Sequence, residues 1–294
     1  MRKYDLDRIR NESLARKVLL VSAGFLTFII IALVFFIGQQ GLRTFLDVSP
    51  LEFFFSAKWS PDTENYGALS FIVGSLLVTF LSIAVGGPVG IAAAVFMAKL
   101  APKWMLEIMK PAVNLYMAIP SVVYGFIGLT VVVPFVREFF GVAGGFGIFT
   151  ASLILSIMIL PTVISISTDA LLAVPSMQEE GSYALGATYW QTIWHIVLPA
   201  AKPGIVTAVI LGMARAIGET MAVQMVIGNT PRLATSLFSP TSTLPSEIVV
   251  EMGNTPFDST WGNSLFLMAL VLLLISLGMI LTVRRIGAKK AVEA

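Results

Sequence analysis

The chain has 294 residues, of which 56% are hydrophobic and only 12% are Asp, Glu, Lys or Arg. Soluble domains carry about 25% charged residues, and a soluble chain of this composition would expose broad apolar surfaces that water disfavours and lipid does not. The composition therefore predicts an integral membrane protein. A formal net charge of +2 provides no basic face for nucleic acid. Because the chain has no cysteine and a single histidine, we expect neither disulfides nor a metal site.

Windows of roughly 20 mostly apolar residues, the length needed to cross about 30 Å of hydrocarbon, occur six times. Backbone groups in lipid must hydrogen-bond within their own segment, so these windows predict helices and an all-α fold; barrel strands would be about ten residues long with alternating polarity. Pro120 and Pro161 interrupt the third and fourth windows, where ordinary kinks explain them as well as functional bends do. The windows are residues 18–38, 69–98, 112–136, 148–168, 204–228 and 262–283.

Lysine and arginine are distributed unevenly among the segments that join these windows. Fourteen of them lie in residues 1–17, 99–111, 169–203 and 284–294, whereas four lie in the segments that would face the other side. By the positive-inside rule, the first group and both termini are cytoplasmic, as an even number of spans requires. The resulting organisation is a cytoplasmic tail (1–17), a six-helix transmembrane domain (18–284) and a second cytoplasmic tail (285–294).

Three segments are predicted on the extracytoplasmic side. In residues 39–68, Pro50 after a serine indicates a short interfacial helix, and Trp59 suits the headgroup region. Residues 137–147 are predicted to be a Gly-rich turn. Residues 229–261 are rich in Pro, Ser and Thr, and we expect little secondary structure in this loop.

The cytoplasmic segment 169–203 has 35 residues, more than a simple connection between two spans needs. Pro175 and Ser176, followed by Glu179, predict a capping box that starts a helix. Gly186 can end that helix in a left-handed turn.

A second short helix is predicted directly after this turn. Thr188 and Gln191 form another capping box, and Pro199 is expected to stop the helix. At helical spacing, one face of it holds Trp190, Ile193, Trp194 and Val197. The segment is therefore predicted to be two short helices, bent at Gly186 and held near the membrane surface.

Five positions of this segment match the EAA motif, E-A-A-x3-G-x9-I-x-L-P, of the membrane subunits of bacterial ABC importers. They are Glu180, Gly186, Ile196, Leu198 and Pro199. Gly181 and Ser182 replace the two alanines, which predicts a looser helix start. The resemblance implies the type I ABC importer permease fold, with 169–203 as a coupling loop whose short helix fits a groove on a separate ATPase subunit. The alternative is an amphipathic loop that only lies on lipid.

The chain has no G-x-x-x-x-G-K-[ST] loop for binding ATP phosphates. Energy for transport would therefore come from another polypeptide or from an ion gradient. The resemblance implies that ATP and Mg bind to partner ATPase subunits, that this chain binds no cofactor, and that it is a transporter subunit without catalytic residues of its own.

The fifth window contains Arg215 and Glu219, four residues apart and thus on one face of a continuous helix near the bilayer midplane. An arginine at that depth costs about 2.5–3.5 kcal/mol on insertion scales, so it normally faces a polar interior. One interpretation is a self-neutralising pair that only holds helices together. The other is an anion pathway, because a guanidinium suits phosphate-like oxyanions, while Glu219 would accept the proton of hydrogen phosphate and repel sulfate.

Several segments also resemble the PstC-type permease subunits of phosphate-specific ABC importers: residues 118–125, 159–161, 215–223 and 226–229. The resemblance implies that Arg215 and Glu219 are needed for phosphate passage across the inner membrane of a prokaryote. It implies as partners a PstA-like permease, two PstB-like ATPase subunits and a PstS-like extracytoplasmic phosphate-binding protein resting on 39–68 and 229–261. The alternatives are sulfate or molybdate import by the same machinery, or an ion-coupled carrier that uses the two residues as a proton relay.

Overall fold

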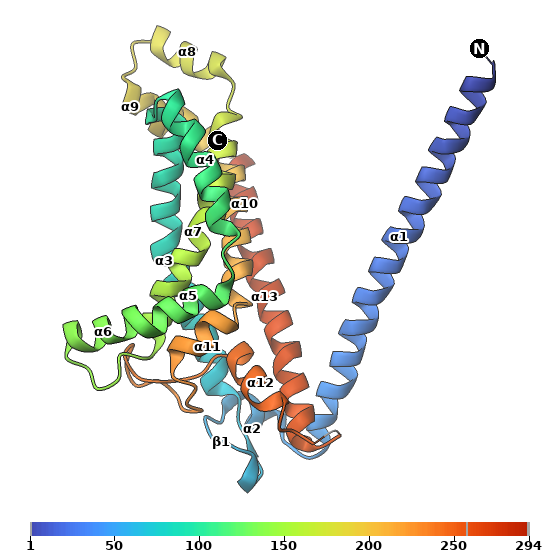
Figure 1. Cartoon of the computed structure of the whole chain (residues 1–294), viewed down its shortest axis with the longest axis vertical. Helices are drawn as coiled ribbons and strands as arrows, with labels where there is room; N and C mark the ends of the chain where they lie inside the picture. The colour runs from blue at the N-terminus through green and yellow to red at the C-terminus, as the bar shows by residue number, and fades with distance from the viewer. Residues whose placement is uncertain (1, 257, 293–294) are drawn as a thin grey trace.

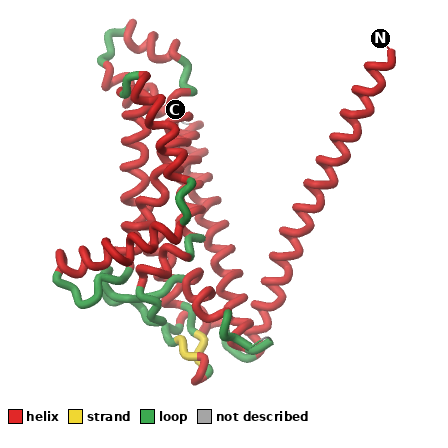
Figure 2. Tube along the Cα trace, in the orientation of Figure 1, coloured by secondary structure: helices red, strands yellow, loops and turns green. Residues whose placement is uncertain are grey.

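The structure is a computed structural model that describes residues 2–256 and 258–292, with side chains placed for 16–256 and 258–285. Nearly all of it is helical, which confirms the all-α class. Two short strands, β1 (Trp59–Ser60) and β2 (Asn65–Tyr66), form an antiparallel hairpin in which Trp59 lies opposite Tyr66. Figure 2 shows this hairpin in yellow at one end of the helical bundle.

Six helical stretches in the described part of the chain are long and apolar enough to cross a membrane, as predicted. In Figure 1 the start of α1, the end of α13 and the helices α8 and α9 all lie toward the top, although α1 stands well away from the others; this agrees with six crossings and a shared side for the two termini. The stretches are Arg16–Leu46, Leu69–Leu100, Ser121–Phe140, Ile148–Leu172, Tyr189–Ile217 and Thr260–Arg285.

Four long helices pack side by side: α3 (Leu69–Val95), α7 (Ile148–Leu172), α10 (Leu198–Ile217) and α13 (Thr260–Val292) (Figure 1). Glycines bring α3 close to α7. A Cβ on Gly86 would lie 2.8 Å from the carbonyl oxygen of Ser156, and one on Gly90 would lie 2.9 Å from Cβ of Val163. Small residues at such positions let membrane helices gain van der Waals contact, the main attraction between helices in lipid.

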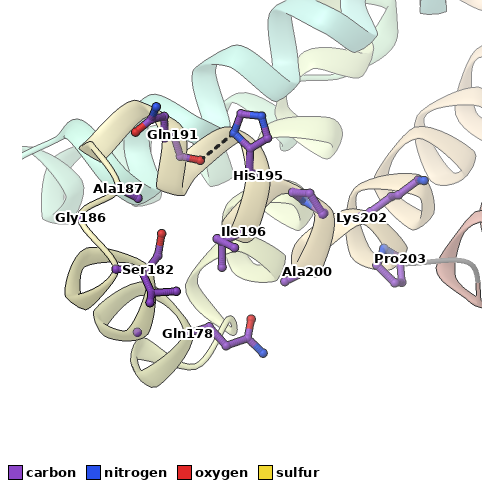
Figure 3. Close-up of a pocket in the computed structure, with 13 residues that line it drawn as sticks. Gln178, Ser182, Gly186, Ala187, Gln191, His195, Ile196, Ala200, Lys202 and Pro203 are labelled. Atoms are coloured by element: carbon purple, nitrogen blue, oxygen red, sulfur yellow. Dashed lines mark hydrogen bonds between the residues drawn. The ribbon is translucent and has the colours of Figure 1, made fainter.

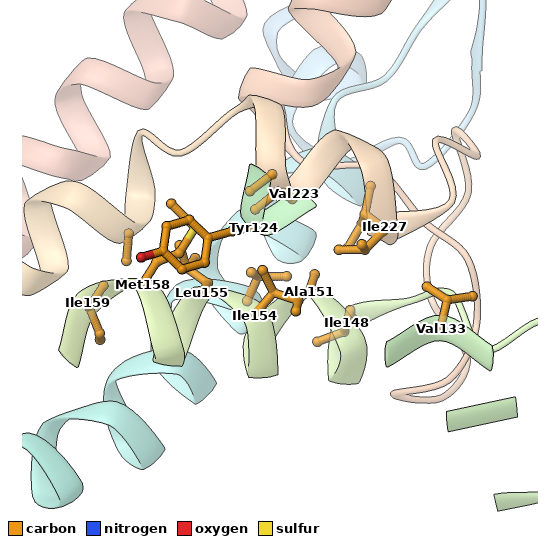
Figure 4. Close-up of a cluster of buried hydrophobic side chains, with 14 residues drawn as sticks. Tyr124, Val133, Ile148, Ala151, Ile154, Leu155, Met158, Ile159, Val223 and Ile227 are labelled. Atoms are coloured by element: carbon orange, nitrogen blue, oxygen red, sulfur yellow. The ribbon is translucent and has the colours of Figure 1, made fainter. Parts of the chain in front are cut away.

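The centre of the bundle is an apolar cluster formed by α7 together with α5 (Ser121–Ile127) and α11 (Met221–Ile227). Figure 4 shows Tyr124 of α5 beside Met158 of α7, with Val223 of α11 nearby. These short helices complete the core beside the long ones, and α11 follows directly on the segment that contains Arg215 and Glu219.

The first helix, α1 (Arg2–Leu42), stands apart from the bundle along most of its length (Figure 1). It meets α13 only near its carboxyl end, where Phe36 packs edge-to-face on Phe266 with ring centroids 5.6 Å apart. The large apolar side chains from Val18 to Phe36 are exposed on all sides of the helix. A helix of this kind needs lipid or another membrane protein around it.

The third span is not the single helix predicted over 112–136. The chain forms α4 (Lys103–Met117), breaks, and continues through α5 into α6 (Val133–Phe140), which runs crosswise to α3 and α7 in Figure 1. Pro120 has no N–H and restricts the residue before it, so the break falls there. The phenol of Tyr124 bridges it by donating a hydrogen bond to the carbonyl oxygen of Tyr116 at 2.9 Å. The helix therefore breaks at Pro120, whereas Pro161 lies inside the continuous helix α7.

The fifth span also differs from its prediction at both ends. Pro199 does not stop a helix, because the chain runs from α9 (Tyr189–Thr192) through a π-helical turn (Ile193–Val197) directly into α10. Pro199 lies in the first turn of α10, where a missing N–H is tolerated. At the other end α10 stops at Ile217, and α11 starts only at Met221. The predicted continuous helix over 204–228 is therefore wrong.

The extracytoplasmic segment 39–68 contains the predicted short helix, α2 (Pro50–Phe55), with its proline in the first turn. Trp59 is not an exposed interfacial anchor but is buried with Phe53 and Phe71. Its indole N–H donates to the carboxylate of Glu251 at 2.9 Å. The hairpin is thus part of a local core.

Two other extracytoplasmic expectations need correction. Residues 229–261 include a helix, α12 (Leu244–Met252), which begins with a capping box formed by Thr243 and Ser246. The turn predicted over 137–147 is shorter, because α6 continues to Phe140 before Gly141 ends it at a φ of 64°. Serine and threonine in 229–261 therefore serve as helix caps as well as loop residues.

Candidate functional site

The predicted coupling loop contains the expected bend. Its first helix, α8 (Ser176–Ala184), is followed by Gly186 in the left-handed region with a φ of 83°. The helix has no side-chain cap at Pro175, so the capping box predicted there is wrong. The second capping box is confirmed: the side chain of Gln191 accepts from the Thr188 backbone at 2.8 Å, and the hydroxyl of Thr188 accepts from the Gln191 backbone at 3.4 Å.

Glu179 forms an ion pair instead of a cap. Its Oε1 lies 2.5 Å from Nζ of Lys99, which extends from the cytoplasmic end of the second span. These side chains are only 20% and 11% exposed, so the pair is shielded from solvent. The phenol of Tyr189 donates to the backbone carbonyl oxygen of Lys99. Lys99 therefore connects both helices of the coupling loop to the end of the second span. The sequence did not reveal this role, because Lys99 was counted only as one of the basic residues that set the orientation in the membrane.

The two residues that replace the alanines of the motif, Gly181 and Ser182, have different surroundings in the structure. Ser182 replaces the second alanine, and its buried hydroxyl lies 2.9 Å from that of Thr192 in α9. Gly181, at the first alanine position, has open space where a Cβ would be. The serine thus adds a polar link across the bend.

A groove of about 1070 Å³ lies between α8 and the helix that runs from α9 into α10 (Figure 3). Of the predicted coupling residues, Gly186, Ile196 and Pro199 line it. Leu198 instead packs against the cluster that contains Ala94, and Glu180 is exposed on α8. The motif residues therefore surround the bend without all facing one surface.

The prediction of one apolar face on the second loop helix is wrong. Ile193 and Val197 are buried, whereas Trp190 and Trp194 are exposed. The π-helical turn over Ile193–Val197 departs from the α-helical spacing on which the prediction was based. His195 is exposed beside Trp194, and its Nδ1 lies 3.1 Å from the carbonyl oxygen of Gln191.

The two charged residues of the fifth span lie at its break. Arg215 is in the last turn of α10, and its Nη1 donates to the hydroxyl of Thr162 in α7 at 3.5 Å. Glu219 lies between α10 and α11, where its Oε1 accepts from the backbone N–H of Ala222 at 3.2 Å. Both side chains are half-buried. The helix end separates them, so they do not share the face of one helix as predicted.

The self-neutralising pair is also excluded, because no ion pair within 4.0 Å joins Arg215 and Glu219 among those of the described residues. Instead, each side chain is held by a neutral partner on a different element. This arrangement leaves the guanidinium with donors to offer and the carboxylate with acceptor capacity. Sequence spacing alone did not reveal the break, because apolar residues continue through it.

Residues 86–291 match the family described as the binding-protein-dependent transport system inner membrane component. This chain belongs to that family. Its members are the permeases of ABC importers, membrane subunits that work with ATPase and extracytoplasmic binding-protein partners. The chain is accordingly a multi-pass inner membrane protein with an ABC importer permease fold.

Comparison with individual proteins agrees with this membership. A probable ABC transporter permease protein, YqgH of Bacillus subtilis (strain 168), is 46% identical over 98% of this chain and 93% of its own. The phosphate transport system permease protein PstC of Pasteurella multocida (strain Pm70) is 37% identical, covering 74% and 73%. A solved bacterial ABC transporter for alginate import shares the fold, with a TM-score of 0.63 at 17% identity over 93% of this chain and 96% of that one.

Proposed function

We propose that this chain is a PstC-type permease subunit that carries inorganic phosphate across the inner membrane. The observation that carries the proposal is Arg215, which lies within the bundle and has no carboxylate partner within 4.0 Å among the described side chains. A guanidinium cannot lose its charge, and placing it at this depth is unfavourable unless an anion or water compensates it. The PstC name of several relatives supports phosphate as that anion.

Glu219 supplies selectivity in this proposal. Its carboxylate already accepts one hydrogen bond from Ala222 and keeps capacity for another. Hydrogen phosphate carries a proton that it can donate there, whereas sulfate at neutral pH has none and would face an unshielded negative group. Arg215 would thus attract either oxyanion, and Glu219 would favour phosphate.

The energy comes from partner subunits. A PstA-like permease completes the pathway, two PstB-like subunits bind ATP and Mg, and a PstS-like protein delivers phosphate on the extracytoplasmic side. On this chain Glu180, Gly186, Ile196, Leu198 and Pro199 belong to the loop that receives the ATPase movement. The exposed groove beside Gly186, Ile196 and Pro199 supports a docking role for this loop.

The test is uptake of labelled phosphate, sulfate and molybdate by the complete complex reconstituted in vesicles. Arg215→Leu should lower phosphate uptake by at least about tenfold, the effect of losing one charge-assisted contact. Arg137→Leu is the matched control, because Arg137 is exposed on α6 and pairs with its neighbour Glu138 at 3.6 Å.

Three results would contradict the proposal. Unchanged phosphate uptake in Arg215→Leu would remove the pathway role of the guanidinium. Preferential uptake of sulfate or molybdate by the unaltered complex would show that phosphate is not the main substrate. Uptake by this chain alone, without ATPase subunits or ATP, would indicate an ion-coupled carrier.

A further inference from the structure

A second polar cavity, separate from Arg215, lies toward the cytoplasmic end of α4 and α7. Its volume is about 150 Å³. Lys110 and Asn114 of α4 line one side, and Ser165, Thr168 and Asp169 of α7 line the other. Five polar residues surround this small space, at the cytoplasmic boundary of the bundle; Lys110 and Asn114 lie outside the candidate spans, whereas Ser165, Thr168 and Asp169 lie at the end of the fourth.

The charged residues of this cavity form a loose pair. Nζ of Lys110 lies 3.1 Å from Oδ1 of Asp169, and the two side chains are 41% and 66% exposed. Ion pairs this exposed contribute little to stability. An incoming anion can therefore take over the ammonium group without loss of a structural contact.

Thr168 provides an independent sign of a ligand. It is 1% exposed, and its buried hydroxyl has no hydrogen-bond partner among the described residues. Nearly all buried polar groups in proteins are hydrogen-bonded, so an orphan hydroxyl on a residue that lines a cavity calls for a missing partner. Rotation of this side chain toward the cavity would bring the hydroxyl to an oxyanion or water bound there.

The cavity lies on the same side of α7 as the Arg215 contact. Thr162, Ser165 and Asp169 follow each other at intervals of three and four residues, which places them along one helix face. Arg215 contacts the first of them and Lys110 contacts the last. Seven residues of helix separate the two contacts by roughly 10 Å, and Ser165 lies between them along the helix.

We propose that this cavity is a second binding station for inorganic phosphate, used after Arg215 on the way to the cytoplasm. The inference rests on the proposed function. Lys110 supplies the positive charge, and Asn114, Ser165 and Thr168 donate hydrogen bonds to the phosphate oxygens. Asp169 accepts the phosphate proton, as Glu219 does at the first position. A bare metal cation fits less well, because the ammonium of Lys110 would repel it.

The test measures equilibrium binding of labelled inorganic phosphate to the complete permease–ATPase complex in nanodiscs, without nucleotide or binding protein. An Arg215→Leu background removes the first position. In that background phosphate binding should persist, and adding Lys110→Gln should weaken it by at least about tenfold. Lys110→Arg should retain it. Lys103→Gln, a change of the same kind at the start of α4 outside the cavity, should have no effect.

Two further variants identify the bound species. Thr168→Val, which keeps the side-chain shape, should weaken binding several-fold without altering assembly. Asp169→Asn should let sulfate compete with phosphate. A phospholipid headgroup has related chemistry but is a diester without a P–OH group, so phosphatidylglycerol added to the nanodiscs should not displace phosphate.

The inference is overturned if the Arg215→Leu complex retains no phosphate binding, if Lys110→Gln matches Lys103→Gln, or if phosphatidylglycerol displaces the bound phosphate. Uptake by the unaltered complex separates this failure from that of the proposed function. If phosphate uptake depends on Arg215 but not on Lys110, the second binding station is contradicted and the proposed function is retained. Absence of phosphate uptake in the unaltered complex would remove both.

Discussion

Glu247 of α12 is a buried carboxyl group on the extracytoplasmic side, outside the candidate membrane spans. Burial raises its pKa from 4.5 to about 7, and the nearby charge of Glu251 adds to this effect. Glu251 is itself fixed by two indole N–H groups, from Trp59 at 2.9 Å and from Trp261 at 2.7 Å. The tryptophans thus hold a carboxylate beside Glu247 that cannot easily move away.

This pair makes stability depend on pH. Between pH 4.5 and about 7 the folded state retains a proton on Glu247 that the unfolded state has lost, so stability falls as the pH rises through this range, by about 3 kcal/mol at most. Glu247→Gln removes the penalty. It should raise the Tm of the purified complex at pH 8 and leave it nearly unchanged at pH 4.5. Glu138→Gln, on exposed α6, should alter neither. A Glu247→Gln curve parallel to that of the unaltered protein would contradict this assignment.

At the scale of elements, the coupling loop depends on the connection between α8 and the end of the second span. The shielded pair of Lys99 and Glu179 is the charged part of that connection. Replacing only one of the two residues leaves the other charge poorly solvated. A single substitution should therefore impair the protein more than the loss of an exposed ion pair does.

Glu179→Gln should therefore reduce phosphate uptake per ATP hydrolysed, with ATP hydrolysis itself retained. Exchanging both charges, Lys99→Glu with Glu179→Lys, should recover part of the loss, since the pair is restored with opposite orientation. Glu107→Gln on the exposed side of α4 is the control. The measurement is the ratio of uptake to hydrolysis in vesicles. Double and single variants with equal ratios would show that the two residues act independently.

The bend between α8 and α9 depends on backbone conformation at Gly186. Its φ of 83° is disfavoured for other residues, although a Cβ would meet nothing within 4 Å. Gly186→Ala should cost about 1–2 kcal/mol, and Gly186→Pro should prevent the turn because proline fixes φ near −65°. Both should lower coupled uptake, with proline the worse. Gly181→Ala, inside α8 and also in open space, should be neutral or stabilising in thermal unfolding. Equal effects of alanine at 181 and 186 would exclude a conformational role for the bend.

These elements also show how far sequence reasoning reaches. Length and hydropathy predicted all six spans, and spacing predicted the left-handed Gly186 and the Thr188 capping box. The break near Gly218 was missed because the apolar run continues through it, and at Pro120 the sequence indicated an interruption but did not distinguish a kink from a full break. The partners of polar side chains could not be predicted from the sequence either. Glu179 pairs with Lys99, 80 positions away, instead of capping its own helix. Tertiary contacts determine which partner such a side chain has.

For the whole molecule, the main question is what surrounds α1. The helix is joined to the bundle at its carboxyl end, where Gln40 donates to Asp258 at 2.7 Å and Gly41 lies against Leu267. The rest of its described length presents apolar side chains to the outside. The position of α1 relative to the other spans therefore depends on this one junction and on the surrounding lipid or partner subunit.

A substitution at Gly41 tests whether the junction between α1 and α13 sets the position of α1. A Cβ there would lie 2.8 Å from the backbone of Leu267, so Gly41→Leu must push α1 away from α13. Overpacking of this kind costs about 1–3 kcal/mol, and the Tm of the purified chain should fall by several degrees. Gly24→Leu places the same side chain on the free part of α1, where nothing lies within 4 Å, and should leave the Tm unchanged. If the related permease subunit packs on α1, Gly41→Leu should also reduce recovery of the intact complex in size-exclusion chromatography. An unchanged Tm would show that the junction does not set the position of α1.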